Sequence, residues 1–401
     1  MGLPLRALAA LTTAAFITVL TEALPAGVLP AMSADLGVGE SAMGQAVTIY
    51  ALGTALAAIP LSSATAGWRR KRLLLCGVAG FAVANTVTAV SGDYMVTMAA
   101  RFVAGVAAGV VWALLAGYAA RLAPEPLRGK AIAVVMAGIP LALSLGVPAG
   151  TFLGGALGWR VTFWVMTAVA VVLLGWIAAL VPDFPGQRHG RPPVRAALRV
   201  PGVPAILFVT LVFVLAHTVL YTYVATFLGA RGLGGAVDVV LLVFGVASMA
   251  SIVVVGAHVD RRLRALTLAS AVLFGVAVAA LAGSTAIVFV AAALWGLGWG
   301  GVPTLLQTAA ARAGGAAADT AQAMLVTLWN AAMAAGGVVG GLLLDHGGPS
   351  ALPWSALVLM PPVLAAVLVA RRHGFPSVRA DHQRDPEGDH RGGDKAVQHT
   401  P

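Results

Sequence analysis

Three ionisable side chains lie deep inside apolar segments of the sequence, and they are its first candidates for chemistry. Glu22 lies in FITVLTEALPAGVLPA, Arg101 in ARFVAGVAAG and His217 in AHTVLYTYVATFL. Ionisable groups are costly in an apolar medium and normally face an interior cavity or mark a pathway. Because desolvation disfavours a carboxylate, the Glu22 carboxyl is suited to hold and release a proton near neutral pH. The alternative for Glu22 is a structural hydrogen bond to a neighbouring helix.

Arg101 and His217 each admit two interpretations. Arg101 shares a helix face with Trp112. It either tunes the carboxyl or binds a polar or anionic molecule, or it caps carbonyls of an adjacent helix. Histidine titrates near neutral pH, so His217 either shares a proton with Glu22 or is a neutral, hydrogen-bonded side chain. We predict Glu22, Arg101 and His217 as proton-coupling residues.

Other polar and aromatic side chains inside apolar segments are candidates for the lining of a small-molecule site. Such sites are mostly apolar, with a few polar groups that fix orientation. For each residue alone, helix packing or an interhelical hydrogen bond is an equal alternative. The predicted substrate-binding residues are Gln45, Tyr50, Trp112, Tyr221, Tyr223, Gln307, Trp329 and Asn330. Tryptophans near segment ends are predicted to form an interfacial belt, namely Trp68, Trp159 and Trp354.

The elements that must position these residues are membrane spans. The chain has 401 residues, of which 59% are hydrophobic and 10% charged, with a mean hydropathy of +0.91. Soluble domains carry about 25% charged residues. Apolar stretches long enough to cross a bilayer as helices recur throughout, and they predict an all-α integral membrane protein with twelve transmembrane helices. The predicted spans are 7–30, 42–66, 73–91, 94–121, 130–156, 161–181, 203–228, 237–258, 265–283, 285–308, 318–344 and 352–370.

The basic residues agree with this arrangement. If the N-terminus is cytoplasmic, nearly all of the 25 Lys and Arg residues lie in cytoplasmic segments, and only Arg160 and Arg231 lie in loops on the other side. This asymmetry follows the positive-inside rule and predicts that both termini are cytoplasmic. The net charge of +10 is spread over short clusters, not along one polar helix face, so we expect no nucleic-acid partner.

Missing motifs narrow the function further. A single cysteine, Cys76, excludes an internal disulfide. The sequence has no G-x-x-x-x-G-K-[ST] motif and no His/Cys cluster with zinc spacing. We therefore expect no ATP-driven pump, no metal and no other cofactor, and we do not expect an enzyme.

A Pro-rich, basic connection divides the chain into two halves. We predict an N-terminal six-helix half (1–181), a cytoplasmic linker (182–204), a C-terminal six-helix half (205–371) and a disordered cytoplasmic tail (372–401). Within the linker, VRAALRV forms either a short amphipathic helix on the membrane surface or a solvated segment. Two pseudo-symmetric halves around a central cavity are typical of secondary transporters.

The predicted fifth span carries small residues at every fourth position. Such a stripe lets another helix approach closely, and prolines at 140 and 148 add bends. Tight packing alone is a sufficient physical explanation of this pattern. The residues that form or interrupt the stripe are Gly138, Ala142, Gly146, Pro148, Gly150 and Gly154.

Several of these stretches together resemble the major facilitator superfamily, in particular its twelve-span bacterial drug/proton antiporter branch. GIPLALSLGVPAGTFLG with GWRVTFW resembles the antiporter motif, ARFVAGVAAG the fourth-span motif and TEALPAGVLPAMSADLGV the first span. GAHVDRRLR resembles the cytoplasmic gate motif, with Gly256, Asp260 and Arg261 in place. The equivalent loop of the first half departs from the pattern, because Gly67 stands where the family has Asp. The resemblance extends over about residues 5–370.

This resemblance implies a monomeric, proton-coupled secondary transporter in a bacterial inner membrane. It implies the major facilitator fold and export of small organic molecules, such as chloramphenicol-like drugs, sugars or purine compounds, by alternating access. The expected partners are the small-molecule substrate, protons and the lipid bilayer. A uniporter or importer on the same scaffold is one alternative, and a non-transporting membrane receptor is another.

Overall fold

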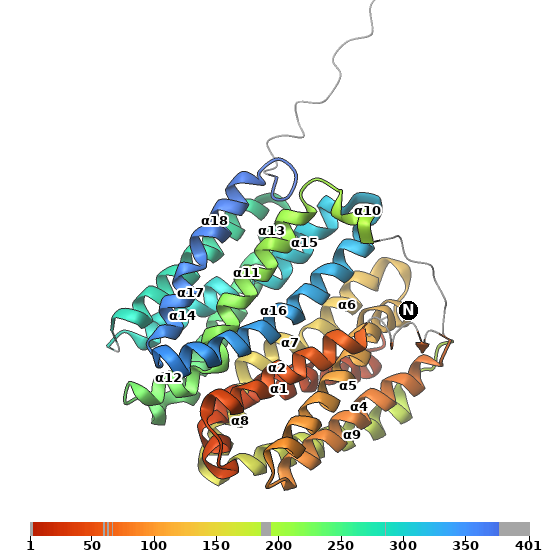
Figure 1. Ribbon diagram of the computed structural model, residues 1–401. Coiled ribbons are helices and arrows are strands. Elements are labelled where there is room, and N and C mark those ends of the chain that lie inside the picture. Colours follow the sequence, from red (N-terminus) through yellow and green to blue (C-terminus); the bar gives the residue numbers. More distant parts are fainter. Residues whose placement is uncertain are drawn as a thin grey trace, which may run out of the picture.

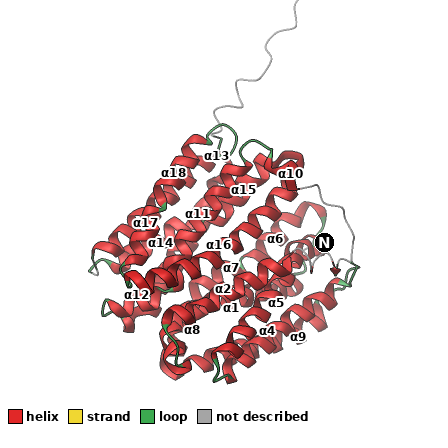
Figure 2. Ribbon diagram, viewed as in Figure 1, coloured by secondary structure: helices red, strands yellow, loops and turns green. Residues whose placement is uncertain are grey.

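The computed structural model describes residues 3–58, 61, 64, 65, 67–185, 194–284 and 286–376, and their regular structure is entirely helical (Figure 1, Figure 2). The middle of the predicted linker and nearly all of the predicted tail lie outside the described residues. The linker segment that is described contains a short helix, α10 (Val194–Leu198), within the stretch VRAALRV.

The described helices of the N-terminal half form six spans. The fifth is interrupted by one π-helical turn, η2 (Ala142–Gly146), between its two prolines. A single 3-10 turn, η1 (Glu125–Leu127), precedes that span. The helices of this half are α1 (Leu5–Leu36), α2 (Glu40–Ala58), α4 (Arg70–Val90), α5 (Tyr94–Leu122), α6 (Arg128–Met136), α7 (Gly138–Leu141), α8 (Val147–Leu157) and α9 (Trp159–Leu180).

The C-terminal half repeats this plan with more breaks. Short 3-10 turns, η3 (Gly234–Ala236) and η4 (Gly315–Ala317), begin two of its spans. Its helices are α11 (Val203–Thr222), α12 (Val224–Ala230), α13 (Val237–Gly283), α14 (Val288–Trp299), α15 (Val302–Gly314), α16 (Ala318–Gly347), α17 (Ala351–Val358) and α18 (Met360–Val369).

The described helices account for twelve spans. Ten described segments are long and apolar enough to cross a membrane. One of them includes α13, whose 47 residues would extend about 70 Å at 1.5 Å per residue if the helix were straight, more than twice the bilayer core. Non-helical torsion angles at Arg262 (φ −133°, ψ 28°) divide α13 into the two spans predicted at 237–258 and 265–283. The shorter helix α2 supplies the described part of the span predicted at 42–66.

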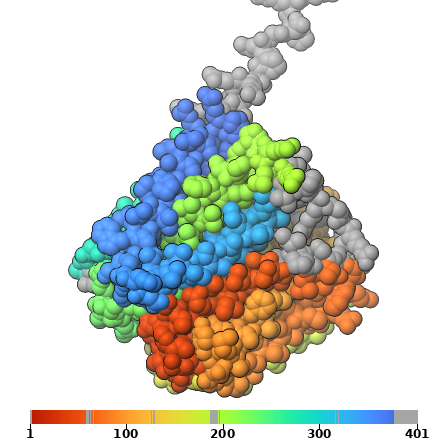
Figure 3. Space-filling model, in the orientation of Figure 1, coloured from red at the N-terminus to blue at the C-terminus, as the bar shows by residue number. Residues whose placement is uncertain are grey.

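The buried hydrophobic residues form two clusters, and one of them contains residues from both halves. One cluster belongs to the N-terminal half alone and includes residues 7–17 of α1. A second, larger cluster joins the C-terminal helices to the far part of α1, from Ala23 to Met32, and to Met43 and Ala46 of α2. The halves are therefore packed together at the end of the bundle opposite the N-terminus. In the space-filling view, α16 of the C-terminal half and α2 lie side by side there (Figure 3).

Hydrogen bonds reinforce this contact between the halves. The Gln45 side-chain amide donates to the Gly337 carbonyl (3.2 Å) and to the Tyr223 hydroxyl (3.4 Å). Thr48 Oγ1 donates to the carbonyl of Ala334 (3.2 Å). These bonds join α2 to α11–α12 and α16, so the predicted substrate-binding residues Gln45 and Tyr223 belong to the seam between the halves.

Candidate functional site

The small-residue stripe of the fifth span lies against α1, the helix that carries Glu22. A Cβ atom added at Gly138, Gly146, Gly150 or Gly154 would overlap α1. The α1 residues met by these added atoms include Thr12, Phe16, Leu20, Leu24 and Val28, which are four apart. The stripe therefore sets the distance and rotation of α1 along most of its length, including the turn before and the turn after Glu22.

Arg101 is buried beside α1. Its side chain is 0% exposed, and Nη2 donates to the backbone carbonyl of Thr21 (2.5 Å). The guanidinium carbon lies 5.1 Å from the centroid of the Tyr50 ring, close enough for a cation–π interaction. The Tyr50 hydroxyl in turn donates to the carbonyl of Thr18 (3.0 Å). Arg101 and Tyr50 are thus both fixed to the α1 backbone next to Glu22.

Glu22 is half-buried and lies within electrostatic range of three of the predicted site residues. Its carboxyl interacts through space with Arg101 and Tyr50 of its own half, and with Tyr221 of the C-terminal half. Glu22 and Arg101 do not form a direct ion pair. The structure thus brings Glu22, Arg101, Tyr50 and Tyr221 into one polar neighbourhood across the two halves.

Asn85 of α4 joins this group, although the sequence analysis did not select it. Its Nδ2 donates to Thr21 Oγ1 (3.3 Å), and its Oδ1 is buried with no partner among the described residues. Arg101 Nε and Nη1 are likewise buried without a described partner. Unpaired donors and an unpaired acceptor therefore flank Thr21. The signal that identifies Asn85 in the sequence is an amide within an apolar span.

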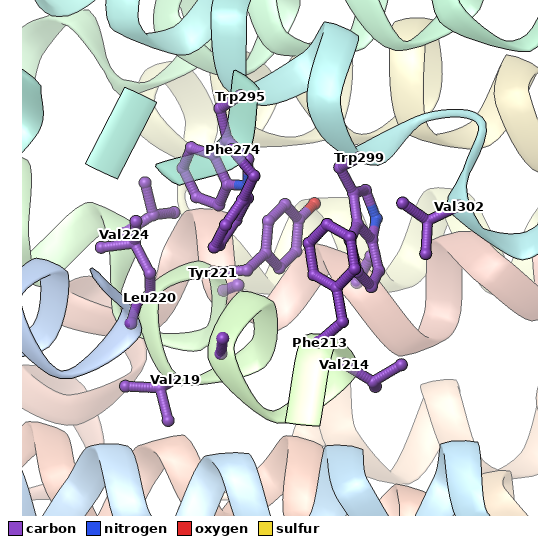
Figure 4. Close-up of a cluster of buried hydrophobic side chains, with 14 of the residues drawn as sticks. Phe213, Val214, Val219, Leu220, Tyr221, Val224, Phe274, Trp295, Trp299 and Val302 are labelled. Carbon is purple, nitrogen blue, oxygen red and sulfur yellow. The ribbon is translucent and has the colours of Figure 1, made fainter. Parts of the chain in front are cut away.

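His217 lies in an aromatic cluster of the C-terminal half. Nδ1 accepts a hydrogen bond from Trp295 Nε1 (3.0 Å), and the ring stacks on Trp299 with centroids 3.6 Å apart and planes 4° apart. The Tyr221 ring stacks on His217 at 5.2 Å. Figure 4 shows Tyr221 between Trp295 and Phe274 on one side and Phe213 and Trp299 on the other. No described charge contacts the imidazole, and His217 is 8% exposed.

Helix geometry explains how this cluster forms. His217 and Tyr221 are four apart on α11, as Trp295 and Trp299 are on α14, so each pair shares one helix face. Between and after the tryptophans, glycines at 296, 298 and 300 allow α14 to pack closely on both segments of α13. A Cβ at Gly298, for example, would overlap the backbone of Phe274. The tryptophans are therefore directed toward α11.

The remaining predicted substrate-binding residues occupy different surroundings. Trp329 lies next to Trp299, with ring centroids 5.6 Å apart. Trp112 packs against the N-terminal core. The Gln307 side chain is exposed, and its backbone carbonyl accepts a bond from Gln322 (2.6 Å). Asn330 Nδ2 donates to Val326 of its own helix (2.9 Å).

Each of the two gate-like loops forms one ion pair with a residue outside it. The loop residue is acidic in the C-terminal half and basic in the N-terminal half. In the C-terminal half, Asp260 Oδ1 pairs with Arg312 Nη2 of α15 (2.5 Å), while Arg261 is exposed. In the N-terminal half, where Gly67 replaces the expected Asp, the basic Arg69 Nε pairs with Asp183 just beyond α9 (2.5 Å). Although desolvation opposes its charged form, hydrogen bonds from the Lys71 amide and from Arg69 hold the pKa of Asp183 below its usual range.

One prediction about the tryptophan belt is wrong. Trp159 is only 4% exposed, and its Nε1 donates to Asp35 Oδ2 (3.0 Å). The neighbouring Arg160 forms an ion pair with the same carboxylate and donates to the Ser91 carbonyl (2.9 Å). Trp159 is buried because this cluster ties the start of α9 to the last turn of α1 and to the connection after α4. Trp68 and Trp354 are exposed, at 47% and 55%.

Comparison with known proteins relates these observations to a family. The family model described as Major Facilitator Superfamily matches residues 11–336. The chain is 32% identical to "Transcription regulatory protein OpdE" of Pseudomonas aeruginosa over 374 residues, 90% of this chain and 93% of that protein. It is 32% and 31% identical to the chloramphenicol efflux pumps of Mycobacterium tuberculosis strains CDC 1551 and H37Rv over 361 residues, 84% of this chain and 86% of each relative.

A solved structure shares the fold. The human organic anion transporter MFSD10 (TETRAN) matches with a TM-score of 0.69 at 16% sequence identity, covering 92% of this chain and 100% of that one. The family match extends over both halves, and the helical architecture agrees with it. The chain therefore belongs to the Major Facilitator Superfamily and is a multi-pass membrane transporter rather than an enzyme.

Proposed function

We propose that this transporter exports a small organic molecule in exchange for protons, and that Glu22 carries the proton. The proposal rests on one observation. The half-buried Glu22 carboxyl lies within electrostatic range of the fully buried Arg101 guanidinium but forms no direct ion pair with it. Arg101 is fixed to the carbonyl of Thr21, the residue before Glu22, so its position relative to the carboxyl is set by the α1 backbone.

Protonation changes the charge of this neighbourhood. With Glu22 ionised, its charge compensates that of Arg101. With Glu22 protonated, Arg101 remains as an uncompensated buried cation with two unpaired nitrogens, which is costly in an apolar interior. The protonated and ionised states therefore favour different arrangements of the helices around α1. If the inward-facing and outward-facing arrangements favour different protonation states of Glu22, the change between them is coupled to the uptake and release of a proton.

The relatives support the class of substrate. Two of them are named as chloramphenicol efflux pumps, so a small organic compound is the expected cargo. The bacterial efflux relatives support an inner-membrane location. The distribution of basic residues supports cytoplasmic termini. Because both halves of the site lie in one chain, a monomer is sufficient for transport.

The test uses purified protein in proteoliposomes with an imposed pH gradient. Glu22→Gln should abolish proton-driven transport of chloramphenicol while substrate exchange without a gradient persists. The matched control is Glu40→Gln, the same change at the start of α2, which should transport as the wild type does. Normal gradient-driven transport by Glu22→Gln contradicts the coupling role.

Two other functions predict different results. A uniporter or importer would keep its effect on the substrate content of cells after an ionophore collapses the proton gradient, whereas an exporter coupled to protons would lose it. A non-transporting receptor deserves a separate test because one relative is named as a transcription regulatory protein. A receptor would move no compound from a panel in an efflux-deficient host and would tolerate Glu22→Gln.

A further inference from the structure

The hydrogen bond between Trp295 and His217 defines the form of the imidazole. The indole Nε1 is a donor only, and it donates to Nδ1 of His217 at 3.0 Å. Nδ1 must therefore be the unprotonated nitrogen. A neutral His217 then carries its hydrogen on Nε2.

The charged form of His217 conflicts with this contact. An imidazolium carries hydrogens on both nitrogens, so Nδ1–H would face the N–H of Trp295. The other ring contacts provide no compensating charge, because they are Tyr221 on α11, Phe244 and Phe274 on α13, and Trp299 on α14. Of these four ring contacts, Tyr221 alone has a side chain that can titrate. Glu22 on α1 interacts with Tyr221, Tyr50 and Arg101.

Nε2 of His217 has no described protein acceptor, and the residue is 8% exposed. We infer that Trp295 fixes His217 as the neutral Nε2–H tautomer, so that His217 donates a hydrogen bond to the transported molecule and does not carry the proton. This inference rests on the proposed transport function, assigns the proton to Glu22 alone and makes Trp295 a positioning residue.

The surroundings of His217 also indicate the chemistry of the group that it binds. A neutral N–H among aromatic rings favours an uncharged acceptor, because a buried ion there would lack a countercharge. Tyr221 and Trp329 provide aromatic surface beside the stack, which suits a planar ring. The expected ligand is therefore an uncharged aromatic compound that carries an acceptor oxygen.

The first experiment measures the tautomer and needs neither ligand nor transport. Full-length protein with ¹⁵N-labelled histidine rings is compared with His217→Gln, which identifies the His217 signals in long-range ¹H–¹⁵N correlation spectra. The expected result is the neutral Nε2–H tautomer from pH 8 down to pH 5.5. In Trp295→Phe, which keeps an aromatic ring but removes the donor, both tautomers and then the imidazolium should appear as the pH falls. An imidazolium or an Nδ1–H tautomer in the wild type at pH 7 overturns the inference.

The second experiment measures the equilibrium binding of chloramphenicol, an uncharged nitrophenyl compound. His217→Gln retains a donor amide and should bind within about threefold of the wild type, whereas His217→Phe should bind about tenfold more weakly, which is about 1.4 kcal/mol. His258→Gln is the matched control, because His258 is exposed and bonds only its own helix. Equal binding by His217→Phe and the wild type contradicts the donor role, and no binding by the wild type overturns the ligand class.

A third measurement separates this inference from the proposed function. The dependence of chloramphenicol transport on the pH gradient should persist in His217→Gln even if the rate changes, because glutamine does not titrate. If His217→Gln loses the gradient dependence as Glu22→Gln does, His217 carries a proton and the inference fails. If the wild type shows no gradient-driven transport while the tautomer is as expected, the proposed function fails and the assignment of His217 stands.

Discussion

The two halves of the molecule use the same scaffold to hold different chemistry. In the N-terminal half, Gly146 and Gly150 of the fifth span pack on α1 on either side of Glu22. In the C-terminal half, Gly336 of α16 packs on Thr218 of α11, next to His217. The first site contains ionisable groups with unpaired nitrogens, whereas the second contains stacked rings with no described charge in contact. Pseudo-symmetry of the backbone therefore does not extend to the side chains, and each half is suited to a different task.

The strongest test of this contrast is Arg101→Lys. Lysine keeps the charge but loses the planar fork that contacts Thr21 and Tyr50. We expect the rate of gradient-driven transport to fall at least about tenfold, which corresponds to 1.4 kcal/mol or more. Transport by purified protein in proteoliposomes measures the loss.

The control is Arg312→Lys, which makes the same change at the exposed pair with Asp260. It should alter transport less than about twofold. If both substitutions have equal effects, the geometry around Arg101 is not what distinguishes the N-terminal site.

A second test compares the two glycine stripes. Gly154→Val should overlap Val28 of α1, and Gly336→Val should overlap Thr218 of α11. We expect each to lower the free energy of unfolding by about 1–3 kcal/mol, seen as a lower Tm of the detergent-purified protein.

Gly155→Val is the matched control on the same helix, because a Cβ at Gly155 meets open space. Its Tm should remain close to that of the wild type. If Gly154→Val lowers the Tm and Gly336→Val does not, the two glycine stripes do not play equivalent roles in packing.

A third test loosens the seam between the halves. The Tyr223 hydroxyl contacts the carbonyls of Gly337 and Ser41 and the amide of Gln45. Tyr223→Phe should weaken the seam by about 1 kcal/mol. A cysteine introduced at Ser41, with Cys76 replaced by Ser, should then react faster with a membrane-impermeant thiol reagent.

Tyr118→Phe is the control for this measurement, because the Tyr118 hydroxyl donates to the Pro182 carbonyl just after α9 and forms no described bond to the C-terminal half. It should leave the reactivity at position 41 unchanged. Equal labelling in both tyrosine variants would show that the Tyr223 bonds do not hold the seam closed.

The smallest effects are expected at the exposed ion pairs. Asp183→Asn should cost less than about 1 kcal/mol, because surface pairs contribute little. Since the folded-state pKa of Asp183 is lowered, its contribution is present above pH 4 or so and is lost as the pH falls through the lower, folded value. Thermal unfolding between pH 3 and 6 should therefore show that the difference between wild type and Asp183→Asn shrinks with acidification.

Asp238→Asn is the comparison, because the Asp238 carboxylate accepts a backbone bond at the exposed start of α13 and forms no described ion pair. A difference between Asp183→Asn and the wild type that stays constant over this pH range would contradict a role for the Asp183 charge.

The sequence predicted more of the fold than of the contacts within the candidate site. Span number, the division into halves and the family follow from long apolar runs, loop charges and motif order, which are local patterns. The break at Arg262 within α13 lies in the loop that these patterns predict between two spans. The burial of Trp159 escaped prediction, because its partner Asp35 lies in the last turn of α1, far away in the chain.

The sequence by itself determined that this chain crosses a membrane many times and that Glu22, Arg101 and His217 are its unusual side chains, since apolar segments and the charges within them are visible without a structure. Only the tertiary structure decided which groups these side chains meet. Arg101 and Asn85 converge on Thr21, while His217 meets Trp295 and Trp299. The physical reason is that contacts between helices depend on the rotation and separation of each pair, which packing of the whole bundle sets.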